Sequence, residues 1–179
     1  MSVALISNLA IPNKKKIPII KNGIIQSGWS YQTVPYTESY STNPNITTTQ
    51  GDGYLEFKIT LNNTWQSTGT AGLTTSQTIR AGDTLVVDFD AESNNLDSRY
   101  NWFGYFAQIN KFNGTFTDYA KGVNINGPGS VSRMTYNVVL ANDSKYFAAP
   151  VFYVCGASSG SRYAQVRIYN MYLVRADES

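Results

Sequence analysis

Apolar and polar residues alternate along several short segments of the chain, which is the pattern of a β-strand with one buried face. In residues 53–61 the apolar set is Leu55, Phe57, Ile59 and Leu61, and the outward set is Tyr54, Glu56 and Lys58. In residues 83–92 the apolar set is Leu85, Val87, Phe89 and Ala91, and the outward set is Val86, Asp88, Asp90 and Glu92. Both segments are therefore predicted to be strands that bury one set and expose the other.

Further strands are predicted at residues 100–109, 133–140, 147–155 and 163–174. Gly, Asn, Asp and Ser residues separate these segments, as expected for turns. No window has the three-to-four-residue apolar spacing of a long amphipathic helix. The pattern predicts an all-β protein, either a sandwich or a barrel.

The N-terminal region is less regular, and Pro12, Pro18, Pro35 and Pro44 are expected to interrupt any strand there. Residues 1–16 are predicted to form an N-terminal arm or edge strand, which could pack on a neighbouring subunit or a larger assembly. Residues 17–179 are predicted to form a single β-sandwich domain, because a chain of 179 residues suits one domain.

Composition excludes several classes of function. The net charge is +2, and the lysine run at residues 14–16 is not a basic stripe, so nucleic acid is not an expected partner. Histidine is absent, which excludes Ser-His-Asp catalysis, Cys-His catalysis and histidine-bound metals. The single cysteine, Cys155, excludes an internal disulfide and is expected to be a small buried residue.

The apolar stretch at residues 3–11 does not predict a membrane segment or a signal peptide. No basic residue precedes it, and it is too short to span a bilayer. We therefore expect no membrane partner. If the protein acts outside a cell, we expect it to arrive there by a route other than signal-peptide secretion.

Three stretches of the chain carry the motifs of a known family. They are residues 19–23 followed by Gly28-Trp29-Ser30, residues 77–91 with a turn at Gly82, and the closing segment 164–174. Together they resemble the jelly-roll carbohydrate-binding modules of the family 4, 9 and 22 type, which also serve as adhesion domains in bacteriophage tail and baseplate proteins. The resemblance implies a galactose-binding-like jelly roll, a two-sheet antiparallel β-sandwich that binds glycans without catalysis.

The closing segment also predicts a local irregularity. Side chains alternate along a strand, so Val166 and Ile168 would normally face away from Met171 and Leu173. All four can share one face only if the strand bulges near Asn170.

Members of that family often hold a structural calcium with acidic residues that follow the opening Asn-Gly segment and begin the closing segment. This chain has Ile24, Ile25, Tyr169 and Asn170 at those places. Calcium prefers several hard, anionic oxygen ligands, so the family's calcium site is not favoured here. No cofactor and no metal ligands are predicted.

Candidate glycan-binding residues come from three strands and one loop. Sugars are recognised by flat aromatic platforms combined with planar polar side chains. In residues 99–109, Tyr100, Trp102 and Gln108 are assigned outward, although Trp102 could equally pack under a loop or against a subunit. Gln165, Arg167 and Tyr169 form an outward polar row that could also be an ordinary solvated face. Trp65 is the loop candidate, whereas Trp29 is interpreted as structural.

Asp88 and Asp90 lie on one strand face, about 7 Å apart. That separation falls in the range used by inverting glycosidases. Any Asp-x-Asp strand supplies the same spacing, so a solvated face or polar groups in a sugar groove is the favoured interpretation. We include both residues among the candidate glycan contacts and predict no catalytic residues.

The sequence thus predicts a non-catalytic glycan-binding module, a bacteriophage virion protein of the tail, baseplate or capsid surface that contacts host cell-wall polysaccharide. Its expected partners are that polysaccharide, other virion proteins and further copies of itself, because weak single sites gain avidity in oligomers. Three alternatives stay open: a structural decoration or connector protein without sugar affinity, an extracellular module of a larger protein, and a glycoside hydrolase using Asp88 and Asp90.

Overall fold

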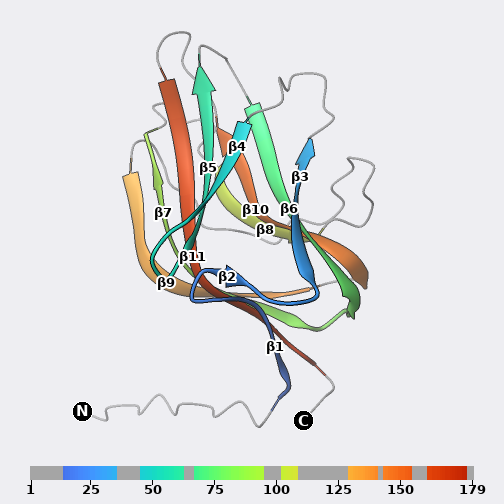
Figure 1. Ribbon diagram of the computed structural model, residues 1–179. Helices are drawn as coiled ribbons and strands as arrows, with labels where there is room; N and C mark the ends of the chain where they lie inside the picture. Colours follow the sequence, from blue (N-terminus) through green and yellow to red (C-terminus); the bar gives the residue numbers. More distant parts are fainter. Residues whose placement is uncertain are drawn as a thin grey trace, which may run out of the picture.

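The computed structural model describes residues 14–35, 45–62, 67–94, 102–108, 129–140, 143–154 and 161–176. Within these ranges the regular structure is all β-strand, arranged as two antiparallel sheets that face each other (Figure 1). This part of the chain has no helix long and apolar enough to cross a membrane. The predicted all-β sandwich is confirmed.

Sheet A is built around the last strand, which pairs with β7 along one edge and with β5 and then β1 along the other. Its strands are β1 (Lys16–Lys21), β2 (Ile24–Ile25), β4 (Asn45–Gln50), β5 (Leu55–Asn62), β7 (Thr84–Ser93), β9 (Gly129–Val139) and β11 (Ser161–Val174). Sheet B has the order β3 (Trp29–Pro35), β6 (Ser67–Ile79), β10 (Ser144–Val154) and β8 (Trp102–Gln108). From β5 onward the chain alternates between the sheets, so strands that follow one another in sequence lie in opposite layers.

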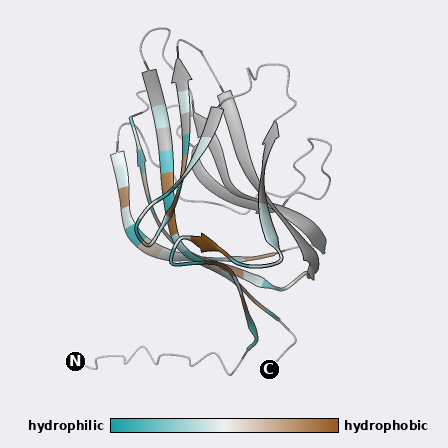
Figure 2. Cartoon of the chain, viewed as in Figure 1, coloured by the Kyte–Doolittle hydropathy of each residue, from teal (hydrophilic) through white to brown (hydrophobic). Residues whose placement is uncertain are grey.

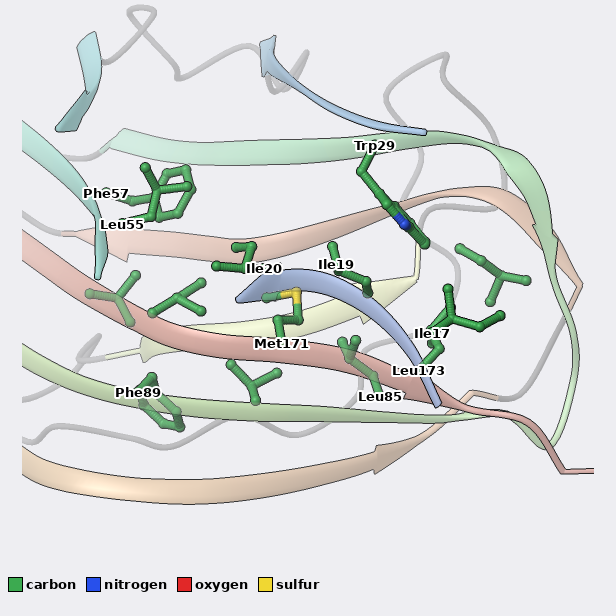
Figure 3. Packing of buried hydrophobic residues seen from close by; sticks show 14 of the residues in the cluster. Ile17, Ile19, Ile20, Trp29, Leu55, Phe57, Leu85, Phe89, Met171 and Leu173 are labelled. Carbon is green, nitrogen blue, oxygen red and sulfur yellow. The ribbon is translucent and has the colours of Figure 1, made fainter. Parts of the chain in front are cut away.

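The core lies between the two sheets (Figure 3). The predicted alternation in β5 and β7 is confirmed for the described side chains, because the inward residues are at most 5% exposed: Leu55, Phe57, Leu85, Val87, Phe89 and Ala91. Trp29 of β3 and Ile79 of β6 belong to the same buried cluster. The structural interpretation of Trp29 is therefore confirmed.

Strand β11 contains the predicted bulge. The pairing of β11 with β7 shifts by one residue between Ile168 and Asn170. The extra residue restores the inward direction, and Val166, Ile168, Met171 and Leu173 are all fully buried. Tyr169 is the residue that the bulge leaves without a register partner on β7.

Two expectations from the sequence were wrong. Pro18 lies inside β1, at a shift in its pairing with β11, so it does not interrupt that strand, whereas β3 does end at Pro35. Val86 was expected to be exposed but is 6% exposed. It does lie on the outward side of β7, directly opposite Tyr172 on β11 and Asn137 on β9.

Candidate functional site

The candidate glycan contacts fall on two different sheets. Gln165, Arg167 and Tyr169 lie on β11, and Asp88 and Asp90 lie beside them on β7, so the structure brings these five together on sheet A. Trp102 and Gln108 are the two ends of β8 in sheet B. Tyr100 and Trp65 lie outside the described residues. The predicted set therefore does not form one continuous site.

The register of sheet B locates aromatic residues near Trp102. Trp102 lies opposite Tyr153 on β10, and the next pair along is Phe103 with Phe152. These four aromatic residues are therefore neighbours in the pairing of β8 with β10.

The outward side of sheet A carries a cluster of polar side chains that we call the polar face. Hydrophilic positions recur along its strands between the apolar ones (Figure 2). The residues alternate with the buried set and are partly exposed or, for Gln165, buried by their neighbours. Its members are Tyr54, Glu56, Lys58, Asp88, Asp90, Glu92, Arg133, Tyr163, Gln165, Arg167, Tyr169 and Asn170.

Arg167 lies at the centre of the polar face. Its Nε donates to Glu56 Oε2 at 3.0 Å, and its Nη1 lies 3.7 Å from Asp90 Oδ1. The hydrogen bond to Glu56 raises the pKa of Arg167, so the guanidinium stays charged. Its side chain is 34% exposed, which leaves part of the guanidinium accessible to a ligand between two fixed carboxylates.

Asp88 is held by a bidentate contact with Arg133. Arg133 Nε and Nη2 donate to the two carboxylate oxygens at 2.9 and 2.7 Å, and Asn170 Nδ2 donates to Oδ2 at 3.0 Å. The hydrogen bond from Arg133 lowers the pKa of Asp88. A glycosidase acid needs a carboxyl with a raised pKa. The environment of Asp88 therefore does not suit the acid role in hydrolysis.

Tyr169 is fixed on three sides. Its hydroxyl donates to Asp90 Oδ2 at 2.5 Å, its ring centroid lies 3.8 Å from the Arg133 guanidinium carbon, and the Tyr54 ring approaches at 5.8 Å with its edge. The hydrogen bond to Asp90 raises the pKa of Tyr169. Because the guanidinium covers one ring face, the flat group presented outward at this point includes Arg133, whose side chain is 54% exposed.

A second group surrounds Glu92. The Tyr163 hydroxyl donates to Glu92 Oε1, and this contact raises the pKa of Tyr163. Gln165 Nε2 donates to the other carboxylate oxygen at 3.3 Å, and Lys58 Nζ lies 4.4 Å from the Tyr163 ring centroid. Gln165 is only 7% exposed, so its main role is to orient Glu92.

Backbone amides of the turn between β1 and β2 donate to oxygens at the bulge of β11. Gly23 N donates to Tyr169 O at 2.9 Å, and Asn22 N donates to Asn170 Oδ1 at 3.1 Å. Gly23 has φ +76°, and a Cβ there would lie 2.3 Å from the Tyr54 carbonyl carbon, so the turn also fixes Tyr54.

Several members of the polar face were not among the predicted contacts. Glu56, Lys58 and Glu92 were recognised as outward but not assigned to a site, and Arg133 and Tyr163 were not considered. The alternation of apolar and polar residues had already indicated that Glu56, Lys58 and Glu92 face outward. Nothing in the local sequence indicates that Glu56 lies opposite Arg167, which is 111 residues away.

No protein-family profile and no curated protein matches the sequence. Among solved structures, the chain is similar to a family 29 carbohydrate-binding module from Piromyces equi, with a TM-score of 0.50 and 9% identity, over 91% of this chain and 92% of that one. At this identity the similarity shows the fold. The chain therefore has a jelly-roll fold of the kind found in carbohydrate-binding modules.

Proposed function

We propose that the chain is a non-catalytic glycan-binding domain that recognises sugar hydroxyls with the polar face of sheet A. The observation that carries the proposal is the Glu56–Arg167–Asp90 cluster at the centre of that face. Planar polar side chains of this kind present donors and acceptors in fixed directions, as hydroxyl recognition requires. The fold shared with a carbohydrate-binding module agrees with a sugar ligand.

The ion pairs hold these side chains in place before a ligand arrives. Arg167, Asp88 and Asp90 each contact a fixed partner, so little rotamer freedom is lost on binding. Their charges are also compensated within the face, which favours hydrogen bonding over ionic attraction. Weak, specific binding of hydroxyl groups is the expected result.

Sheet B provides a second surface for the same function. Trp102, with Gln108 at the other end of β8, is proposed as an aromatic platform because β8 and β10 place aromatic pairs side by side. Tyr100 and Trp65 stay predicted contacts on sequence grounds alone.

The test is binding of purified protein to soluble β-glucan, mannan, xylan and bacterial cell-wall polysaccharide, by affinity electrophoresis and calorimetry. Asp90→Asn should weaken binding about tenfold, because it removes the carboxylate that orients Arg167 and Tyr169. Asp52→Asn, the same change in an exposed turn between β4 and β5, is the matched control and should bind like the unmodified protein. Circular dichroism confirms that each variant is folded.

Each outcome decides between the surfaces. Loss of binding in Asp90→Asn alone supports the polar face. Loss in Trp102→Ala with Asp90→Asn unaffected assigns the glycan to sheet B and overturns the polar-face proposal. Binding to no polysaccharide in the panel overturns the glycan-binding function altogether.

We further propose that the domain is part of a bacteriophage virion and contacts the host cell wall. This step rests on the resemblance of residues 19–23, 77–91 and 164–174 to phage adhesion domains. Neighbouring genes for tail, baseplate or capsid proteins would support it, and a genomic setting with no virion genes would overturn it.

One observation favours the structural alternative, a virion connector. Ile24, Met134 and Val139 are exposed apolar residues, at 60%, 38% and 68%. Ile24 lies on β2 and Val139 on β9, both edge strands of sheet A, where an unpaired strand can join another subunit. Analytical ultracentrifugation of the unmodified protein and of Val139→Ser tests this alternative. If the chain is a connector, the unmodified protein should form oligomers and the variant should not.

A further inference from the structure

Strand β9 forms one margin of sheet A, next to β7 (Figure 1). Within the described part of the chain β9 pairs with β7 alone, so its other side is an edge. Its 11 residues include no proline and one charged residue, Arg133, and Val139 near its end is 68% exposed. Charges and prolines are the usual means by which an edge strand avoids pairing. This long edge has few of them and can therefore accept another strand.

A bulge divides β9 into an irregular part and a regular part. The register of β9 on β7 shifts between Phe89 and Ala91, where Ser132 and Arg133 together oppose one residue of β7. A bulge disrupts the ladder and bends the strand, so this part of the edge is poorly suited to pairing. The regular part, residues 134–139, contains no charged residue. Pairing with another strand is therefore expected along the regular part.

The backbone of the regular part directs donors and acceptors to the edge at every second residue. Leu140 N donates to the carbonyl oxygen of Asp83, on the β7 side, at 2.8 Å. Backbone groups alternate in direction along an antiparallel strand, so those of Thr135, Asn137 and Val139 point away from β7. Each of the three residues presents one N–H and one carbonyl in the plane of the sheet. The ligand that matches such a row is an extended polypeptide strand.

We infer that β9 pairs antiparallel with β9 of a second copy of the chain, across a two-fold axis at Asn137. Asn137 then lies opposite its own equivalent, and Thr135 lies opposite Val139 of the other copy. All three residues whose backbone points to the edge exchange hydrogen bonds. The bulge stays outside the pairing, no like charges meet, and the exposed Val139 gains a β-branched neighbour. This match is reciprocal, as an interface between two identical copies requires.

The dimer joins two copies of sheet A into one continuous sheet. A two-fold axis perpendicular to a sheet keeps each face on its own side, so the two polar faces lie on the same side of the dimer. A two-fold interface also closes on itself, which gives a dimer and not the open array that a connector forms. The inference goes beyond glycan binding and does not depend on it.

Sedimentation equilibrium over a concentration series tests the pairing. The unmodified chain should reach twice the mass of one chain. Asn137→Pro removes an N–H that points to the edge and leaves the bonds between β9 and β7 in place, so the monomer should stay folded. It should raise the dissociation constant about tenfold or more, because the two-fold axis removes the donor twice. Asn137→Ala keeps the N–H and is the matched control, which should dimerise like the unmodified chain.

Disulfide trapping tests the register, in chains that also carry Cys155→Ser. Asn137→Cys places two thiols at the two-fold axis, where facing Cα atoms lie about 5.5 Å apart and a disulfide can form. Thr135→Cys, two residues away on the same side of the strand, places the thiols about 14 Å apart and should not be trapped. A chain that is monomeric at every concentration overturns the inference. So do unchanged dimerisation of Asn137→Pro, and trapping of Thr135→Cys in place of Asn137→Cys.

Discussion

Two aspartate–arginine pairs differ in burial although their aspartates lie close together in the sequence, one just before β7 and one within it. Asp83, just before β7, contacts Arg175 at 2.6 Å, and their side chains are 0% and 6% exposed. Asp88, within β7, contacts Arg133 at 2.7 Å, and their side chains are 20% and 54% exposed. The two pairs have the same chemistry and differ in burial, so one holds segments of the fold together and the other belongs to the partly exposed polar face.

The buried pair connects several segments. Asp83 accepts hydrogen bonds from Arg80 N at 2.9 Å and Ala176 N at 3.2 Å, and its own backbone carbonyl accepts from Leu140 N at 2.8 Å. Arg175 N donates to Lys15 O at 3.0 Å. The pair thus ties the turn before β7, the end of β9, the end of β11 and the approach to β1.

The largest expected effect is that of Arg175→Met. Removing one partner leaves the Asp83 carboxylate buried without its cation, which costs about 3–5 kcal/mol of unfolding free energy. Urea denaturation measures the change. Arg133→Met is the matched control and should leave the urea midpoint nearly unchanged, because its side chain is mostly in water. Equal losses in the two variants would show that burial does not distinguish the pairs.

The next largest effect concerns the turn that joins β1 to β2. Gly23→Ala combines an unfavourable positive φ with a collision against the Tyr54 backbone, and it should cost at least about 2–3 kcal/mol. Gly28→Ala has the same sign of φ, at +86°, but meets no atom within 4 Å, so it should cost only about 1–2 kcal/mol. Thermal denaturation compares them, and equal costs would contradict a close approach of Tyr54.

A smaller effect is expected for Tyr169→Phe on the polar face. The variant loses the hydrogen bond to Asp90, which contributes about 0.5–1.5 kcal/mol. The folded protein raises the pKa of this tyrosine, so its contribution is complete below the unfolded pKa of about 10 and is lost as pH rises through the folded pKa. The stability difference between Tyr169→Phe and the unmodified protein should therefore shrink above about pH 10.

The smallest effect is the acid dependence contributed by Asp88. Its folded pKa is lowered, chiefly by the hydrogen bond from Arg133, so its contribution is complete above the unfolded pKa of about 3.9 and is lost as pH falls through the folded pKa. Comparing urea midpoints of Asp88→Asn and the unmodified protein should give a small difference at neutral pH that disappears in acid. A difference that stays constant below about pH 4 would contradict this.

Much of sheet A could be predicted from the local alternation of apolar and polar residues. Strands β5 and β7 alternate clearly, and the need for four apolar residues of β11 to share a face located the bulge near Asn170. Strands β4 and β6 were not predicted, because Thr, Ser and Gly dominate them and supply no apolar alternation. Threonine favours strands through its branched side chain, but a pattern based on hydropathy does not register that preference.

The sequence by itself determined which residues face outward on β5, β7 and β11, because side-chain direction follows from the period of a strand. Only the tertiary structure decided which of them meet. Glu56 and Arg167 are 111 residues apart, and Asp83 and Arg175 are 92 apart, so strand register and sheet order bring each pair together. Burial is also decided by the tertiary structure: Asp83 is buried because it contacts Arg175 and Ala176 at the end of β11, whereas Asp88, five positions on, lies on the partly exposed face of sheet A.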